Sequence, residues 1–432
     1  SSKRGSIPLG ANPKIRPARL AGLICIRIVT RNPWRLRSVY MQAALLFLAD
    51  GSVFPGTSFG AEPLEVDQLT PGEAREKGAG EVVFNTAMSG YHEVLTDPSY
   101  SGQIVTMTYP HIGNYGNNDE WSEVGPEPAS DRSGVKAAAF VLRSLYEGPV
   151  AHERVPLSDF LARHNTPGIT DVDTRGLTLH LRDEGSVNGV IVAAPEGFRR
   201  WRAEETIPRE FRSRVLEYLR AFPEMEGRNL VTEVGTTVEE IINPEGSPHI
   251  ALLDCGVKGN IVRELVSRGA RVSVWPSSAD PEEILAGDPD ALVVSNGPGD
   301  PAVLAYQIES VKRLMSEKPT LGICLGHQLI SEAIGAKTYK MKFGHHGVNH
   351  PVRDEQTGKV FVTSQNHGFA VEEESLPENA TVWLKNANDG SIEGIKLTDV
   401  PVLSAQFHPE ASPGPRDARW IFEDFMELLR SR

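Results

Sequence analysis

The 432-residue sequence predicts an α/β protein. Its carboxy-terminal part should form a doubly wound, mostly parallel sheet, preceded by a separate mixed α/β, strand-rich domain. From about residue 248, strand-like and helical segments alternate at regular spacing, which is typical of a parallel sheet. Residues 41–190 instead hold short alternating runs with many glycines and prolines. We expect the boundary near residue 245, which gives an amino-terminal domain with its linker over 41–245 and a second domain over 246–432.

The first 40 residues stand apart because they hold nine Lys or Arg and no Asp or Glu, in a chain whose net charge is −13. A basic, acid-free leader is typical of an organellar transit peptide, but an extension upstream of the native start has the same composition. We expect a disordered or non-native extension here, and we exclude it from the fold.

The composition excludes several classes of protein. No apolar run approaches the roughly 18 residues that span a bilayer, so we expect no membrane association. The balance of 44 basic against 57 acidic residues disfavours a nucleic-acid surface. Three cysteines make no disulfide framework in a chain of this length, and no CxxC or HExxH spacing indicates zinc. A cytoplasmic setting follows, or an organellar one if the leader is a transit peptide.

The carboxy-terminal domain is predicted element by element from its hydrophobic periodicity. Ile261, Leu265 and Val266 share one helical face, for example, and Gly269 suits the end of that helix. The predicted order is strand 249–256, helix 258–269, strand 270–276, a strand running into a glycine loop over 290–300, helix 302–317 and strand 319–324. Functional loops of such sheets lie at the carboxyl ends of the strands.

The amino-terminal domain gives fewer local signals. After Met41, the run QAALLFLADGSVF predicts a strand, an Asp50-Gly51 turn and a second strand. A charged helical stretch follows over 198–222, and then a link that contains INPEGSP.

Cys324 lies between two glycines in LGICLGHQLI, after a predicted strand and before a predicted helix. Gly322 and Gly326 allow the tight turn that exposes a nucleophile at a strand end. The following helix N-terminus favours a thiolate, and the Leu325 N–H would lie near the sulfur, where it could hold an oxyanion. Taken alone, however, this motif leaves a nucleophile and a buried core thiol equally open.

A thiol nucleophile needs a base, and the base needs a group that orients it. His408 in AQFHPE follows an apolar run, and Glu410 lies two residues on, so both point to the same side of an extended segment. By itself HPE also fits a surface turn. His327 lies on the predicted helix after Cys324, where a packing or capping role is expected.

Two other motifs are weaker when taken alone. His345, His346 and His350 in FGHHGVNH suggest a metal, but no carboxylate or thiol is spaced suitably beside them, so we expect no metal site. In SNGPGD (295–300), two glycines flank Pro298 and present backbone N–H groups suited to an anionic oxygen. Neither GxGxxG nor GxxxxGK[ST] is present.

Together, the glycine loop, the GxCxG elbow and the final HxE resemble the class I, or triad, glutamine amidotransferase domain over residues 248–432. GEVVFNTAMSGYHEVLTDPSYSGQIVTMTYPHIGNYG (80–116) and DVDTRGLTLHLRDEGSVNG (171–189) resemble the amino-terminal domain of the carbamoyl phosphate synthetase small-subunit family. Further segments that resemble this family are KMKFGHHGVNHPV (340–352), SQNHGFAV (364–371) and HPEASPGP (408–415).

The resemblance implies a role for each matching residue. Cys324 would attack the glutamine side-chain amide, His408 would act as base and then acid, and Glu410 would orient His408. The residues that would bind glutamine are Ser99, Gly297, Gly299, Leu325, Gln328, Asn366, Gly368 and Phe369.

The resemblance also implies a partner. A large subunit would use ATP and magnesium, receive the ammonia and make carbamoyl phosphate for arginine and pyrimidine synthesis, while this chain would hold no cofactor. Two alternatives stay open: a glutaminase subunit of another synthase, such as anthranilate or guanylate synthesis, and a noncatalytic regulatory subunit of the same fold.

Overall fold

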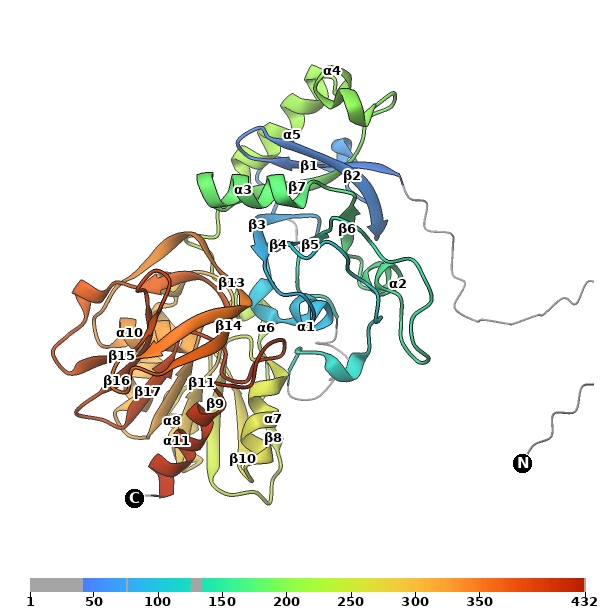
Figure 1. Cartoon of the computed structure of the whole chain (residues 1–432). Coiled ribbons are helices and arrows are strands. Elements are labelled where there is room, and N and C mark those ends of the chain that lie inside the picture. Colours follow the sequence, from blue (N-terminus) through green and yellow to red (C-terminus); the bar gives the residue numbers. More distant parts are fainter. Residues whose placement is uncertain (1–41, 75–76, 126–133, 431–432) are drawn as a thin grey trace, which may run out of the picture. The chain divides into compact units, whose positions relative to one another are not determined.

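The computed structural model describes residues 42–74, 77–125 and 134–430 (Figure 1). All of them belong to one compact unit. The expectations for residues 1–40 lie outside the described residues. Among the helices that are described, none combines the length and the apolar character that crossing a membrane requires.

Seven strands of the amino-terminal part close into a mixed barrel in the order β1-β2-β6-β5-β4-β3-β7. The pairs from β3 through β4 and β5 to β6 are parallel, and the others are antiparallel. Gly51 turns the chain between the first two strands at φ 95°, so the predicted strand–turn–strand is confirmed. The strands are β1 (Ala43–Leu48), β2 (Val53–Gly60), β3 (Ala79–Asn85), β4 (Gln103–Met107), β5 (Ala139–Val141), β6 (Pro167–Thr170) and β7 (Val187–Ala193).

Helices lie against this barrel or connect its strands. The predicted helical stretch over 198–222 is divided, because Pro208 lies at the N-cap of a new helix. That helix packs Phe211, Val215 and Leu219 on residues of β1 and β7. The helices here are α1 (Tyr91–Thr96), α2 (Leu157–Arg163), α3 (Thr174–Glu184), α4 (Ala203–Thr206) and α5 (Arg209–Ala221), with 3-10 turns η1 (Val66–Gln68), η2 (Pro98–Tyr100), η3 (Asp119–Trp121) and η4 (Arg200–Arg202).

The carboxy-terminal part is built on a ten-stranded sheet in the order β14-β13-β15-β16-β17-β12-β11-β9-β10-β8. The five strands from β17 to β10 are mutually parallel, which confirms the predicted α/β class and its parallel core. The strands are β8 (Glu240–Ile242), β9 (His249–Asp254), β10 (Arg271–Pro276), β11 (Ala291–Val294), β12 (Thr320–Ile323), β13 (Thr338–Asp354), β14 (Val360–Val371), β15 (Ala380–Asn386), β16 (Ile392–Leu397) and β17 (Val402–Ala405).

Both edges of this sheet differ from the alternating pattern. Four antiparallel strands extend it beyond β17, because the chain after α10 runs through hairpins without intervening helices. At the other edge β8 pairs with β10, although its residues were assigned to the linker. A three-residue strand carries too little periodicity to be recognised in the sequence.

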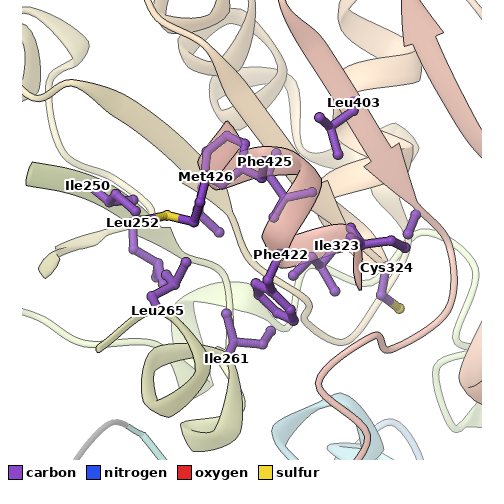
Figure 2. Close-up of a cluster of buried hydrophobic side chains, with 14 of the residues drawn as sticks. Ile250, Leu252, Ile261, Leu265, Ile323, Cys324, Leu403, Phe422, Phe425 and Met426 are labelled. Carbon is purple, nitrogen blue, oxygen red and sulfur yellow. The ribbon is translucent and has the colours of Figure 1, made fainter. Parts of the chain in front are cut away.

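Helices cover both faces of the parallel core, which makes the sheet doubly wound. On one face, Ile261 and Leu265 of α7 pack with Phe422 and Phe425 of α11 against strand residues such as Leu252 (Figure 2). On the other face lie α8, α9 and α10. The helices are α6 (Val231–Val234), α7 (Gly259–Ser267), α8 (Pro281–Ala286), α9 (Ala305–Met315), α10 (Leu325–Ala333) and α11 (Trp420–Arg430), with η5 (Pro301–Val303) and η6 (Glu373–Ser375).

Candidate active site

Cys324 forms a sharp turn between β12 and α10. It has φ 54° and ψ −104°, a backbone conformation that residues other than glycine rarely adopt. A Cβ on Gly326 would lie 2.1 Å from the Val294 carbonyl oxygen, and one on Gly322 would lie 2.5 Å from the side chain of Ile330. Both glycines are therefore needed because the helix packs directly on the strands, and the strained turn aims Cys324 away from them.

The thiol lies at the edge of the core beside Ile323 (Figure 2). Cys324 is buried, at 3% exposure. Its Sγ lies 3.5 Å from the Asn366 carbonyl oxygen and 3.8 Å from Nε2 of Gln406. Gln406 was not among the predicted residues. Its signal in the sequence was its place two residues before His408, on the same extended segment.

His408 and Glu410 form the pair that the HxE motif predicts. Nδ1 of His408 lies 2.7 Å from Oε1 of Glu410, and both side chains are buried. Burial lowers the pKa of His408, but the Glu410 carboxylate and the Cys324 sulfur outweigh burial and raise that pKa. Nε2 of His408 has no hydrogen-bond partner within the described part of the chain, so it is free to exchange a proton.

Lys258 forms an ion pair with Glu410 that sequence reasoning missed. Its Nζ lies 3.0 Å from Oε1 of Glu410 and donates to the carbonyl oxygen of Ala411, and its side chain is almost fully buried. Burial raises the pKa of Glu410, but the charges of Lys258 and His408 lower it further than burial raises it, so Glu410 stays ionised. In the sequence, Lys258 was only the first residue of a predicted helix, and no motif links it to position 410.

Most of the predicted glutamine-binding residues lie together with Cys324 around one pocket. Its lining includes seven of them: Ser99, Gly297, Gly299, Gln328, Asn366, Gly368 and Phe369. Leu325 does not line the pocket, but its N–H is the first of α10 and therefore has no partner within the helix. The lining also includes residues that were not predicted, namely Gln103, Met225, Pro298, Lys340, His346 and His367.

Hydrogen bonds from the second domain hold Ser99 at this pocket, although it comes from η2 beside the barrel. Nδ2 of Asn296 donates to Oγ of Ser99 at 2.8 Å, and Nδ2 of Asn366 donates to Oδ2 of Asp97 at 3.0 Å. Asp97 in turn accepts from the Ser99 N–H at 2.9 Å. The two halves of the chain therefore build the pocket jointly.

The glycine loop after β11 is held by close backbone packing. A Cβ on Gly297 would lie 2.1 Å from the carbonyl oxygen of Cys255, and one on Gly299, at φ 93°, would lie 2.7 Å from that of Arg228. Burial raises the pKa of the Cys255 thiol, and this cysteine lies in the core. Cys255 therefore has the environment of a buried core thiol, the alternative that the sequence left open for Cys324.

One histidine of FGHHGVNH, His345, lies beside two carboxylates. Donor atoms of His345, His367 and Glu393 lie within 4.8 Å of one another, a grouping that spacing alone did not reveal. Burial lowers the pKa of His345, but Asp389, at 2.8 Å, and Glu393 raise it to about 9. A protonated imidazole offers no lone pair to a metal, so this arrangement fits a buried ion pair. The expectation of no metal site stays a prediction.

Comparison with known proteins first gives the class. The family model for class-I glutamine amidotransferases matches residues 251–428, the part that contains the elbow and the His408–Glu410 pair. A second model, the CPSase domain of the carbamoyl-phosphate synthase small chain, matches residues 46–191 of the barrel part.

Whole-chain relatives then give the family. The carbamoyl phosphate synthase small chain of Neisseria meningitidis serogroup A is 46% identical over 406 residues, which cover 90% of this chain and 98% of the relative. That of Neisseria gonorrhoeae is 47% identical with the same coverage, and that of Halomonas eurihalina is 44% identical over 90% of this chain and 99% of the relative. This chain therefore belongs to the carbamoyl phosphate synthase small chain family and is a glutamine amidotransferase, so the alternative of another synthase is wrong.

Proposed function

We propose that this chain hydrolyses glutamine to glutamate and ammonia through a cysteinyl thioester on Cys324. The observation that carries the proposal is the pairing of a strained, buried Cys324 with the His408–Glu410 pair beside one pocket. Elsewhere in the described structure the remaining cysteine, Cys255, is packed in the core without such a pair.

The reaction follows from these groups. His408 takes the thiol proton at Nε2 while Sγ of Cys324 attacks the side-chain carbonyl carbon of glutamine. Backbone N–H groups of Leu325 and the 297–299 loop stabilise the oxyanion. His408 returns the proton to the departing nitrogen, and ammonia leaves as the thioester forms. Water, deprotonated by His408, then attacks the thioester and releases glutamate and the free thiol.

Glu410 and Lys258 support the base without touching the substrate. Glu410 accepts from Nδ1, which fixes the tautomer that leaves Nε2 facing the thiol, and it stabilises the imidazolium that forms. Lys258 keeps Glu410 ionised despite complete burial. Among the predicted binders, Gln328 and Asn366 would bind the substrate through their amides, and Ser99 would reach in from η2.

The ammonia is passed to a large subunit, which uses ATP and magnesium to make carbamoyl phosphate for arginine and pyrimidine synthesis in the cytoplasm. Neutral ammonia, rather than ammonium, is the nucleophile toward activated bicarbonate, so a protected path between the subunits is required. The family assignment supports this partner. No cofactor is assigned to this chain.

The direct test is glutamine hydrolysis by the wild type and by Cys324→Ser, each with the large subunit present. We expect ammonia and glutamate from the wild type only, whereas ammonia-dependent carbamoyl phosphate synthesis persists in both. A thioester trapped on Cys324 by acid quench would identify the intermediate. If wild type and variant are equally inactive on glutamine, the noncatalytic alternative replaces this proposal. Recovery of the chain without any synthetase partner would contradict the assignment of the large subunit.

A further inference from the structure

Glu123 is a buried carboxylate of the barrel part that takes no direct part in the proposed hydrolysis. It lies just after η3 and is completely buried, at 0% exposure. It is not among the described residues that line the pocket around Cys324. A buried carboxylate is costly unless donors satisfy it, so the groups that surround Glu123 indicate its role.

The donors to the Glu123 carboxylate come from two segments of the carboxy-terminal part. The first is the N-terminus of α7, where the Asn260 N–H donates to Oε2 at 3.0 Å and Nη2 of Arg263 lies 2.5 Å from Oε1. The second is the loop after Glu410, where Oγ of Ser412 donates to Oε1 at 2.8 Å. The carboxylate therefore joins these two segments to each other and to the barrel part.

The same two segments hold Glu410 in place. From α7, Nδ2 of Asn260 donates to the backbone carbonyl oxygen of Glu410 at 2.5 Å. At the N-cap of α7, Lys258 pairs with the Glu410 carboxylate at 3.0 Å and also donates to the Ala411 carbonyl oxygen. A displacement of α7 relative to the loop would therefore move both the backbone and the carboxylate of Glu410, and so the acceptor that faces Nδ1 of His408.

The loop after Glu410 needs this restraint because its backbone is strained. Ala411 has φ 59° and Ser412 has φ 57°, so two consecutive residues lie in the left-handed region that residues other than glycine rarely adopt. Strained backbone persists only where the surrounding structure determines it. The Ser412 hydroxyl is bound to Glu123, and the Ala411 carbonyl oxygen is bound to Lys258. These contacts keep the loop in the conformation that carries Glu410.

We propose that Glu123 is a positioning residue for the hydrolysis of glutamine. Its carboxylate clamps the N-terminus of α7 to the loop after Glu410 and thereby keeps Glu410 against His408. The inference rests on the proposed glutaminase function and adds a residue of the barrel part to it. Because Glu123 acts on the base and not on the pocket lining, its loss should lower kcat and leave KM nearly unchanged.

The test compares Glu123→Ala with the wild type in glutamine hydrolysis with the large subunit present. Burial raises the pKa of Glu123 to about 7, although the neighbouring cations lower it, so assays at about pH 8 keep the wild-type carboxylate mostly ionised. Misplacement of Glu410 by up to about 1 Å should lower kcat about 10- to 100-fold. The backbone of Glu123 keeps its bonds to Thr96 and Gly259, which supports folding of the variant.

The matched control is Glu264→Ala, on the same helix. Glu264 is also a buried carboxylate, and its partners are Arg268 at 2.6 Å and Arg419 at 2.8 Å. Neither partner belongs to the two segments that hold Glu410. The control therefore loses a buried ion pair without releasing Glu410, and it should keep the kcat of the wild type even if it unfolds at a lower urea concentration.

Two further readouts distinguish positioning from a general loss of structure. Glu123→Gln should recover most of kcat, because its amide can accept from the Asn260 N–H and donate to Oγ of Ser412. The Nδ1–H of His408, with 2.7 Å between Nδ1 and the Glu410 carboxylate oxygen, should give a downfield proton NMR signal in the full chain. That signal should shift or disappear in Glu123→Ala and stay unchanged in the control.

Ser412→Ala keeps the proposal testable even if Glu123→Ala does not fold. It releases the loop from Glu123 without removing the carboxylate, and it should lower kcat at unchanged KM. The inference is overturned if neither variant has a lower kcat than the Glu264→Ala control, if Glu123→Gln loses as much kcat as Glu123→Ala, or if kcat falls while the His408 signal stays in place. The proposed function fails separately, if the wild type does not hydrolyse glutamine.

Discussion

The packing at the elbow predicts a strong effect for Gly326→Ala. A Cβ there would lie 2.1 Å from the carbonyl oxygen of Val294, 2.7 Å from its carbonyl carbon and 3.0 Å from its Cβ. A comfortable carbon–oxygen contact needs roughly 3.3 Å, so α10 and β11 must separate by about 1 Å. β11 is a central strand with parallel partners on both sides, and it cannot yield without disturbing them.

Two measurements follow from this displacement. Overpacking of this kind costs about 1–3 kcal/mol, so the free energy of unfolding from urea titration should fall by that amount. Because α10 begins directly after Cys324, a shift of about 1 Å also misplaces this proposed nucleophile, and kcat/KM for glutamine hydrolysis should fall roughly 100-fold.

Gly287→Ala is the matched control for this substitution. Gly287 has φ −70°, and an added Cβ would meet only the carbonyl oxygen of Ile284, at 3.3 Å. Stability and activity of this control should stay within about 0.5 kcal/mol and twofold of the wild type. If Gly326→Ala is as stable and as active as Gly287→Ala, the elbow does not depend on close helix–strand packing, and the reasoning is refuted.

Three further outcomes are expected. Lys258→Met leaves the buried Glu410 carboxylate without its cation and should lower the free energy of unfolding by about 3–5 kcal/mol. The control Lys318→Met removes a surface ion pair and should lower it by less than about 1 kcal/mol. Equal losses in the two variants would contradict a structural role for the buried pair. Glu410→Gln removes the charge that raises the His408 pKa. Because His408 must be neutral to take the thiol proton, the acidic limb of the kcat/KM profile should move to lower pH, and an unmoved limb argues against that coupling. The pKa of His345 is raised to about 9 in the folded state, so its contribution to the free energy of unfolding is complete below about pH 6.5. About 3 kcal/mol of that free energy is lost as pH rises through about 9. Unfolding titrations at several pH values should show this loss in the wild type and not in His345→Gln.

Local patterns recovered much of the carboxy-terminal domain. The predicted strands and helices from 249 to 333 appear in the predicted order, because each is long enough to show its own hydrophobic period. The six-residue α8 (Pro281–Ala286) between two of these strands was not predicted. The amino-terminal barrel was predicted only as strand-rich, since closure depends on pairing β1 with β7 and other partners distant in sequence. Nothing in a short alternating run says which strand it will join.

The candidate site also contains residues that were predicted from the sequence and residues that were found only in the structure. The GxCxG elbow and the HxE pair are local arrangements that the sequence displays, and the family resemblance joined them into the prediction that Cys324, His408 and Glu410 act together. Lys258 is 152 residues from Glu410 in the sequence, and no spacing rule links the two, whereas Gln406 had only its place two residues before His408 as a signal. Sequence reasoning missed Lys258 because its partner Glu410 is distant in the sequence.

The sequence by itself determined the family and predicted the chemistry, from a cysteine on a turn that flanking glycines allow and a histidine with a carboxylate two residues away. The tertiary structure decided what surrounds that chemistry. Folding buries Lys258 against Glu410 and brings Lys340 to Glu81 beside the pocket. The reason is physical: a buried charge is stable only beside a partner, and chain folding alone brings residues so distant in sequence together.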